Sequence, residues 1–267
     1  MTQKSIRKLL AILLAVPFSV YAEQPKVLTV VADTYYPYNC AEGAKPEGLI
    51  LDITREVFEP KGYQIRYKVV PWTRALKMVK DGQADIALGS PPEEAETHGL
   101  IKGSEPIGYA TDCVYVHANN PLKYNNRADD LNSLKSVGTV TDFQYYEQFG
   151  EWLQRPENKR KNISSRGETA SQINLIHLAS GRLDGVFETS AVMDYLIMQQ
   201  RAEGKVRVAG CQKQQSAFNL FSPLRKDARQ LAVELDEGIL ALEKSGKIKE
   251  ILARYGIHEW KGSTKSK

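Results

Sequence analysis

The chain has 267 residues, and 36 Lys and Arg against 32 Asp and Glu give it a formal net charge of +4. Lys4, Arg7 and Lys8 lie in a predicted signal peptide, and losing these three charges lowers the net charge of the mature chain to +1. This near-neutral balance gives no support to nucleic-acid binding. Because the three cysteines lack a CxxC or Cys/His spacing, we expect neither a metal site nor a cofactor.

The N-terminus has the three parts of a secretory signal peptide. A basic start is followed by an apolar run over 9–20 and by small residues that place cleavage after Ala22. The run is too short to span a bilayer, which takes about 20 residues. We therefore expect residues 1–22 to be removed and the mature chain, from Glu23 to Lys267, to be soluble and periplasmic.

The first part of the mature chain alternates between strand and helix patterns. The aromatic loop Tyr35-Tyr36-Pro37-Tyr38 follows the first apolar run. The order strand-helix-strand-helix-strand is typical of a mostly parallel sheet covered by helices. The patterns predict a strand over 27–32, a helix over 49–58, a strand over 63–70, a helix over 73–80 and a strand over 84–88.

A second copy of the pattern follows about 100 residues later. A strand over 137–140 leads into an aromatic loop, and a helix over 169–179 leads into another buried strand. The spacing of Gly82 and Asp85 recurs at Gly181 and Asp184, where a glycine ends a helix before the turn into a strand. The repetition predicts two similar α/β lobes.

Two extended stretches, 109–116 and 216–222, are placed to join the lobes, and helices over 227–243 and 247–255 follow the second. Lobe 1 would then comprise 23–108 and 217–267, and lobe 2 would comprise 109–216. A ligand crevice is expected between them, at the strand ends.

Five segments together carry a resemblance to a known family. The whole mature chain resembles the family 3 extracellular solute-binding proteins, periplasmic receptors of the amino-acid-binding kind, in a divergent branch marked by PWxRAL. The resemblance implies a type II Venus-flytrap fold, in which two lobes hinged by two strands close on a small ligand. The segments are the aromatic-proline loop, GLILDITREVF, PWTRALKMVKDGQADIAL, SGRLDGVFE and ALEKSGKIKEILARYGI.

The resemblance also implies where the ligand is held. An arginine after the third strand normally pairs with the α-carboxylate of an amino acid, but Thr97 stands at that position and no arginine lies between Gly89 and Gly108. In lobe 2, Thr189 replaces the aspartate that normally takes the α-ammonium, with Glu188 beside it. Unless Arg74 substitutes, a standard free amino acid is not expected. The expected ligand contacts are Asp33, Tyr35, Tyr36, Trp72, Arg74, Ser90, Thr97, Thr141, Asp142, Phe143, Glu188 and Thr189.

Several of these residues have a simpler structural explanation. Trp72 is also suited to packing in the core, and Arg74 to a solvated helix surface. Glu188 is expected either in the crevice, facing a cationic ligand, or at the core edge beside a lysine. The acids Glu93, Glu94 and Glu96 are read as a solvated helix start, and the tyrosines of the first loop as divided between crevice and packing.

The cysteine positions favour one disulfide. Cys113 follows the first crossing and Cys211 precedes the second, and strands that cross side by side would bring the two together. Cys40 would remain a free thiol. Three reduced cysteines are the alternative.

Three functions fit the sequence. The first is a monomeric binding protein that delivers a small polar solute to an ABC permease. The second is a receptor that presents its ligand to a membrane sensor. The third is an enzyme on the same fold, similar to prephenate or arogenate dehydratases, with Glu188 as general acid. We favour binding without catalysis, because those substrates are carboxylates and the crevice is poor in cations.

Overall fold

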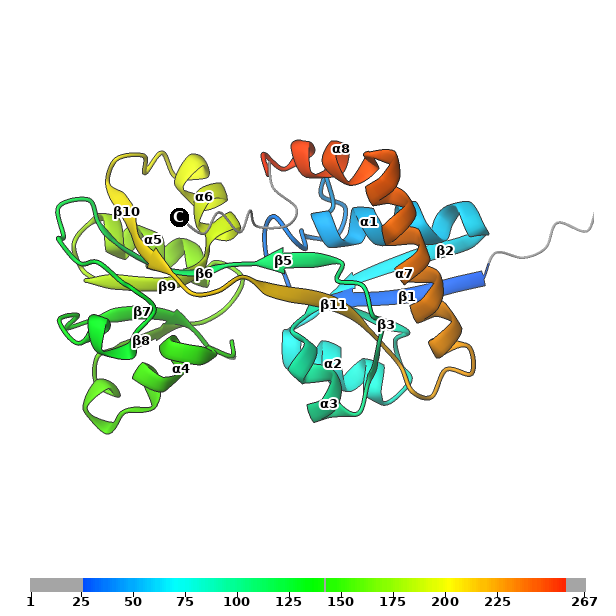
Figure 1. Ribbon diagram of the computed structural model, residues 1–267, viewed down its shortest axis with the longest axis horizontal. Helices are drawn as coiled ribbons and strands as arrows, with labels where there is room; N and C mark the ends of the chain where they lie inside the picture. The colour runs from blue at the N-terminus through cyan, green and yellow to red at the C-terminus, as the bar shows by residue number, and fades with distance from the viewer. Residues whose placement is uncertain (1–25, 142, 258–267) are drawn as a thin grey trace, which may run out of the picture.

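A computed structural model of the chain describes residues 26–141 and 143–257, and it has two α/β lobes side by side (Figure 1). This confirms the predicted two-lobed α/β architecture. The predicted signal peptide and Asp142 lie outside the described residues. Within the described ranges, no helix is both long and apolar enough to cross a membrane.

Lobe 1 is built around a six-stranded sheet with the strand order β2-β1-β3-β11-β4, in which β5 also pairs with β11. The pairs β1–β2 and β1–β3 are parallel, whereas β11 runs antiparallel to its neighbours. Its elements are β1 (Lys26–Ala32), α1 (Leu49–Phe58), β2 (Tyr63–Val69), α2 (Trp72–Lys80), β3 (Ile86–Ser90), α3 (Pro92–His98), β4 (Ile101–Lys102), β5 (Gly108–Ala110), β11 (Gln215–Phe221), α7 (Ala228–Ser245) and α8 (Lys247–Arg254), with a 3₁₀ turn at Glu59–Lys61.

Lobe 2 has a five-stranded sheet with the order β10-β6-β9-β7-β8. Strands β7, β8 and β9 are mutually parallel, and β6 runs antiparallel to β9 and β10. Its elements are β6 (Asp112–His117), β7 (Val137–Val140), α4 (Glu147–Gln154), β8 (Asn162–Ser165), α5 (Ala170–Ala179), β9 (Gly185–Thr189), α6 (Ser190–Gln199) and β10 (Val206–Cys211), with 3₁₀ turns at Ala128–Leu131 and Pro156–Asn158.

The sequence pattern of the central strands follows from burial on both faces. Leu28, Val30 and Ala32 of β1 pack into one hydrophobic cluster of lobe 1, while Val31 packs into a second cluster on the opposite face. A strand covered on both sides reads as a continuous apolar run, because successive side chains point to opposite faces. Strand β2 lies at the sheet edge and alternates between buried and exposed residues, as its sequence predicts.

Two connections join the lobes, and β5 and β11 run beside each other between them (Figure 1). The stretch predicted as one extended segment over 109–116 divides at Thr111 into β5, which pairs in lobe 1, and β6, which pairs in lobe 2. The return runs from Cys211 at the end of β10 to Gln215 at the start of β11. Cys113 and Cys211 form a disulfide next to these connections, and Cys40 is a free, buried cysteine.

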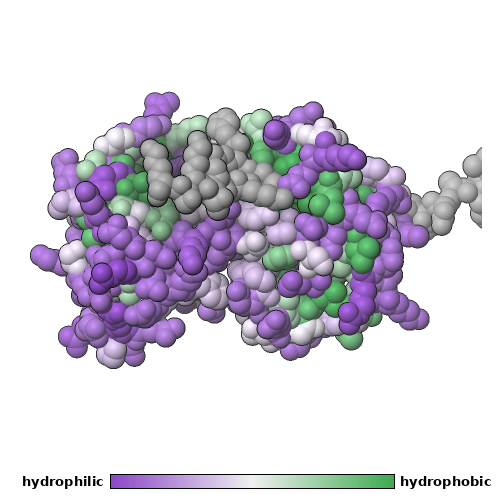
Figure 2. Space-filling view, in the orientation of Figure 1, coloured by the Kyte–Doolittle hydropathy of each residue, from purple (hydrophilic) through white to green (hydrophobic). Residues whose placement is uncertain are grey.

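The molecular surface differs between parts of the protein. On the face shown in Figure 2, hydrophilic side chains dominate the part of lobe 2 that carries α4, while hydrophobic groups are interspersed over lobe 1. The exposed large hydrophobic side chains are dispersed over several elements, Leu224 being the most exposed at 67%. Single exposed apolar residues of this kind are ordinary in folded proteins.

Candidate functional site

A cleft of about 150 Å³ lies between the two lobes. The parallel strands β1, β3 and β9 point their carboxyl ends at it, as does the loop after β7, and this is where α/β sheets bind ligands. The lining residues are Asp33, Tyr35, Tyr38, Asn39, Ile50, Trp72, Gly89, Pro91, Glu94, Ala110, Asp112, Phe143, Gln144, Tyr145, Tyr146, Glu188, Thr189, Gln215, Ser216 and Ala217.

Glu188 and Thr189, at the end of β9, form the polar floor of the lobe 2 side. Both are buried, and the Glu188 carboxylate accepts hydrogen bonds from the Ser171 hydroxyl (2.5 Å) and from the Thr189 N–H (2.8 Å). The Thr189 hydroxyl donates to Asp112 Oδ1 at 2.7 Å. Burial is the main cause that raises the pKa of Glu188 to about 7, while its hydrogen bonds act in the opposite direction.

Tyr35 connects the lobes across the cleft. Its hydroxyl oxygen lies 2.9 Å from Glu188 Oε1 and 2.5 Å from Thr189 Oγ1, and its ring packs edge-on against Phe143 with a centroid distance of 5.2 Å. Burial and the nearby Glu188 carboxylate raise the pKa of Tyr35, so the phenol stays protonated. A side chain of lobe 1 is thus bonded to the residues where the resemblance implies an α-ammonium.

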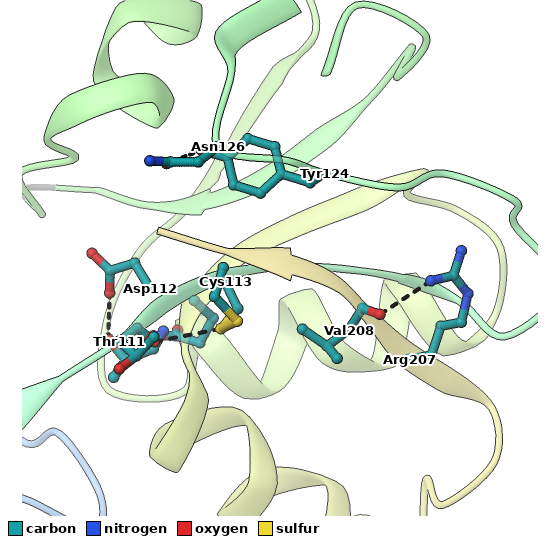
Figure 3. Close-up of a disulfide and its surroundings, with 10 residues drawn as sticks. Thr111, Asp112, Cys113, Tyr124, Asn126, Arg207 and Val208 are labelled. Atoms are coloured by element: carbon teal, nitrogen blue, oxygen red, sulfur yellow. Dashed lines mark hydrogen bonds between the residues drawn. A yellow bond between two sulfur atoms is a disulfide. The ribbon is translucent and has the colours of Figure 1, made fainter. Parts of the chain in front are cut away.

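Asp33 and Asp112 contribute one carboxylate from each side. Asp33 follows β1, and burial raises its pKa to about 6, opposed only by a hydrogen bond from its own backbone N–H. Asp112 is the first residue of β6, beside the disulfide (Figure 3), and burial raises its pKa as well. Sequence reasoning missed Asp112, although a single acid in the apolar segment YATDCVYV was a readable signal.

Six of the expected contacts line the cleft. These are Asp33, Tyr35, Trp72, Phe143, Glu188 and Thr189. Trp72 does so as the first residue of α2, and it also packs against a hydrophobic cluster of lobe 1, so both readings of this side chain apply. Sequence reasoning did not anticipate Asn39, Gln144 or the β11 residues Gln215–Ala217, because their patterns carry no distinctive chemistry.

Thr97 and Arg74 are not among the residues that line the cleft. Thr97 is exposed on α3, and its hydroxyl donates to the Glu93 carbonyl at 2.9 Å, so this helical position does not stand in for a carboxylate anchor. Arg74 is exposed on α2, two residues beyond Trp72, where the helical rotation of about 100° per residue carries it to another face.

The remaining expected contacts lie elsewhere. Ser90 is fully buried, and its hydroxyl donates to the Pro91 carbonyl at 3.2 Å. The Thr141 hydroxyl is 2.7 Å from that of Ser164. Tyr36 stacks on Tyr195 of lobe 2 with a centroid distance of 5.4 Å, and both line a second interlobe cavity of about 310 Å³. That cavity adjoins α5 and α6 instead of the strand ends. Asp142 lies outside the described residues.

The structure corrects the reading of the acids after β3. Glu94 does not belong to a solvated helix start: it is 7% exposed, its Oε2 lies 2.9 Å from His98 Nε2, and it lines the cleft. Glu93 and Glu96 lie on the same short helix but are exposed. Residues at these positions face other directions around the helix axis than Glu94 does.

The raised acid pKa values predict how stability depends on pH. An acid whose pKa is higher in the folded state binds protons more tightly in that state. The free energy of unfolding therefore decreases as the pH rises from the unfolded-state pKa of the acid to its folded-state pKa. For Asp33 this window runs from 3.8 to about 6, and for Glu188 from 4.5 to about 7. An Asp33→Asn variant should therefore gain about 1 to 2 kcal/mol of unfolding free energy at pH 7.5 and less at pH 4.5.

Urea unfolding at the two pH values measures this difference. Glu157→Gln is the matched control, because it removes one carboxylate from an exposed position on lobe 2. An Asp33→Asn variant that is less stable than the parent protein at pH 7.5 would contradict the prediction.

Comparison with known proteins identifies the family. The model of the bacterial extracellular solute-binding proteins, family 3, matches residues 27–258. A probable histidine-binding protein of Neisseria gonorrhoeae is 24% identical over 217 residues, which cover 80% of this chain and 76% of that protein.

Solved structures show the same fold. A histidine kinase sensor domain similar to periplasmic binding proteins superposes with a TM-score of 0.68 at 19% identity, covering 90% of this chain and 97% of its own. The arginine-, lysine-, histidine-binding protein ArtJ of Geobacillus stearothermophilus gives a TM-score of 0.67 at 19% identity, with coverages of 88% and 97%. Since the family model spans most of the sequence, the chain belongs to the bacterial extracellular solute-binding proteins, family 3.

Proposed function

We propose that this protein captures one small polar solute between its two lobes in the periplasm, and that the solute is not a standard free amino acid. The observation that carries the proposal is the composition of the interlobe cleft. Both lobes contribute to its lining, and no Lys or Arg is among the described residues that form it.

The lack of a Lys or Arg in the described lining restricts the kind of ligand that the cleft can bind. A carboxylate that leaves water for a closed cleft needs a partner charge, and an arginine provides the bidentate one. Without it, the negative charge of an α-carboxylate has no opposite charge in the described lining to offset its lost hydration. On the amine side, the Tyr35 hydroxyl already lies against Glu188 and Thr189. The carboxylate end of an α-amino acid thus meets unfavourable surroundings, and the usual position for its amine is already occupied by the Tyr35 hydroxyl.

Capture is preferred over catalysis. One observation favours an enzyme, because a pKa of about 7 would suit Glu188 for general acid work. However, prephenate-like substrates carry carboxylates, which need the same cation that the described lining lacks. The family consists of solute-binding proteins, and this supports the simpler role.

Delivery of the solute is open to two kinds of partner. An ABC permease fits the solute-binding family, and a membrane sensor fits the fold shared with the histidine kinase sensor domain. We favour a permease, with the protein acting as a monomer.

Native mass spectrometry of protein purified gently from the periplasm tests the proposal. We expect one solute per chain, lost on unfolding and restored by titration after refolding. Trp72→Ala should weaken its binding about 10- to 100-fold, since an aromatic side chain that lines the cleft contributes strongly to affinity. The neighbouring Thr73→Ala is the control, because Thr73 is exposed and does not line the cleft. Turnover of an added carboxylic acid would contradict capture.

A further inference from the structure

The charges that line the cleft all have one sign. Four of the described lining residues are acidic, namely Asp33, Glu94, Asp112 and Glu188, and none is Lys, Arg or His. The acids come from different places in the chain: the loop after β1, helix α3, the start of β6 and the end of β9. The fold therefore concentrates negative charge that the sequence keeps apart.

Two of the four acids have side-chain or backbone partners within the protein. Glu94 pairs with His98, which reaches it from one turn further along α3. Glu188 accepts hydrogen bonds from Ser171 and the Thr189 amide, with the Tyr35 hydroxyl also within reach. The carboxyl groups of these two acids therefore have polar partners without a ligand.

Asp33 and Asp112 have no such compensation. Among the described residues, no salt bridge involves either of them, and Asp112 Oδ1 accepts only a neutral hydroxyl, that of Thr189. Burial of each raises its pKa without an opposing cation. Both residues are half-buried, and a carboxylate that loses part of its hydration without gaining a cation costs stability. Such a cost at two positions that line one cleft points to a role in binding.

The rest of the lining suits an organic cation. Six aromatic rings surround the acids, and a ring face attracts an ammonium or guanidinium group within about 6 Å of its centre. The cavity of about 150 Å³ has the size at which a benzene-sized molecule fits. No group of three described His, Cys, Asp or Glu residues is arranged to hold a metal ion. The rings belong to Tyr35, Tyr38, Trp72, Phe143, Tyr145 and Tyr146.

We propose that the cleft binds a small organic cation that lacks a carboxylate, a protonated amine or guanidine, with its charge on Asp33 and Asp112 and its hydrocarbon part against the aromatic rings. This inference rests on the proposed function and narrows its ligand class. A diamine would use both carboxylates at once, and a monoamine would use one.

Matched pairs of compounds isolate the carboxylate. We would titrate the refolded, ligand-free protein by calorimetry with histidine and histamine, arginine and agmatine, and lysine and cadaverine. In at least one pair, the amine should bind about 100-fold more tightly than the amino acid, which must bury an uncompensated carboxylate. An amino acid that binds as tightly as its amine would overturn the inference, and so would failure of all three amines at millimolar concentration.

Charge-removing variants locate the contact. Asp33→Asn and Asp112→Asn should each weaken amine binding about 10- to 100-fold, since each keeps the side-chain shape but loses the charge. Glu157→Gln removes a distant exposed charge and should leave the affinity unchanged. Equal affinities for all three variants, or tight binding of Ca²⁺ alone, would overturn the inference.

The two proposals fail in different ways. A neutral or anionic solute found by native mass spectrometry would remove the cation inference but leave solute capture intact. Absence of any bound solute, together with no binding of any added compound, would remove solute capture itself.

Discussion

A Phe187→Ala variant should lose about 3 to 5 kcal/mol of unfolding free energy, because the substitution empties the centre of lobe 2. Phe187 is fully buried on β9, with its ring stacked on Phe149 at a centroid distance of 4.2 Å and edge-on to Trp152 at 5.8 Å. Removing the ring loses buried apolar area and the aromatic contacts with Phe149, Trp152 and Tyr145, in a closely packed cluster.

Urea unfolding followed by circular dichroism measures the loss. The matched control is Ile176→Ala on α5 of the same lobe, whose side chain is 46% exposed, and it should stay within about 0.5 kcal/mol of the parent protein. A decrease of less than about 1 kcal/mol in the free energy of unfolding of Phe187→Ala would show that the aromatic cluster does not stabilise lobe 2 as expected.

Removing the disulfide should cost about 2 to 4 kcal/mol. The bond joins Cys113 and Cys211, which are 98 residues apart, so it closes nearly all of lobe 2 into one loop and restricts the unfolded chain. A Cys113→Ser, Cys211→Ser double variant should therefore unfold at a lower urea concentration than the parent protein.

Cys40→Ala is the control for this comparison, because it removes the free cysteine and leaves the disulfide intact. Peptide mapping without reduction should recover the Cys113 and Cys211 segments linked to each other. Equal stability of the double variant and the oxidised parent protein would contradict the prediction, and so would a linkage to Cys40.

The two carboxylates without a cation in the cleft connect the stability of the protein with its proposed function. Asp33 and Asp112 are held where burial raises the pKa of each, and a cation that binds there would compensate for the lost hydration. The two substitutions that remove these carboxylates, Asp33→Asn and Asp112→Asn, are then expected to weaken binding and to stabilise the ligand-free protein, an opposition commonly found at binding sites. Asp33→Asn tests both effects in one chain.

Local pattern was enough to predict the α/β elements and the two lobes. The helix over 49–58 and the strand over 137–140 have the predicted bounds. Their apolar patterns involve only residues that are close together in the sequence, so the patterns can be recognised without the tertiary structure. The family resemblance implied cleft positions for Asp33 and Trp72, and both residues line the cleft. One follows a strand end and the other begins a helix, so their places depend on the backbone direction alone.

Residues along short helices could not be placed in this way. Glu94 and Thr97 are three positions apart on α3, yet the first is buried in the cleft and the second is exposed. Which side of such a helix faces the cleft depends on how the helix packs against β11 and β4, and a seven-residue segment carries too little periodicity to reveal it.

The sequence by itself determined the two-lobed fold, the export signal as an expectation, and the lack of an arginine after β3. Only the tertiary structure decided what the cleft contains. Tyr35 and Glu188 are 153 residues apart, and Asp33 and Asp112 lie on different lobes. The physical reason is that charges and hydroxyls interact over a few ångströms. The distances between these residues depend on how the two lobes pack together, and the local sequence pattern does not reveal that packing.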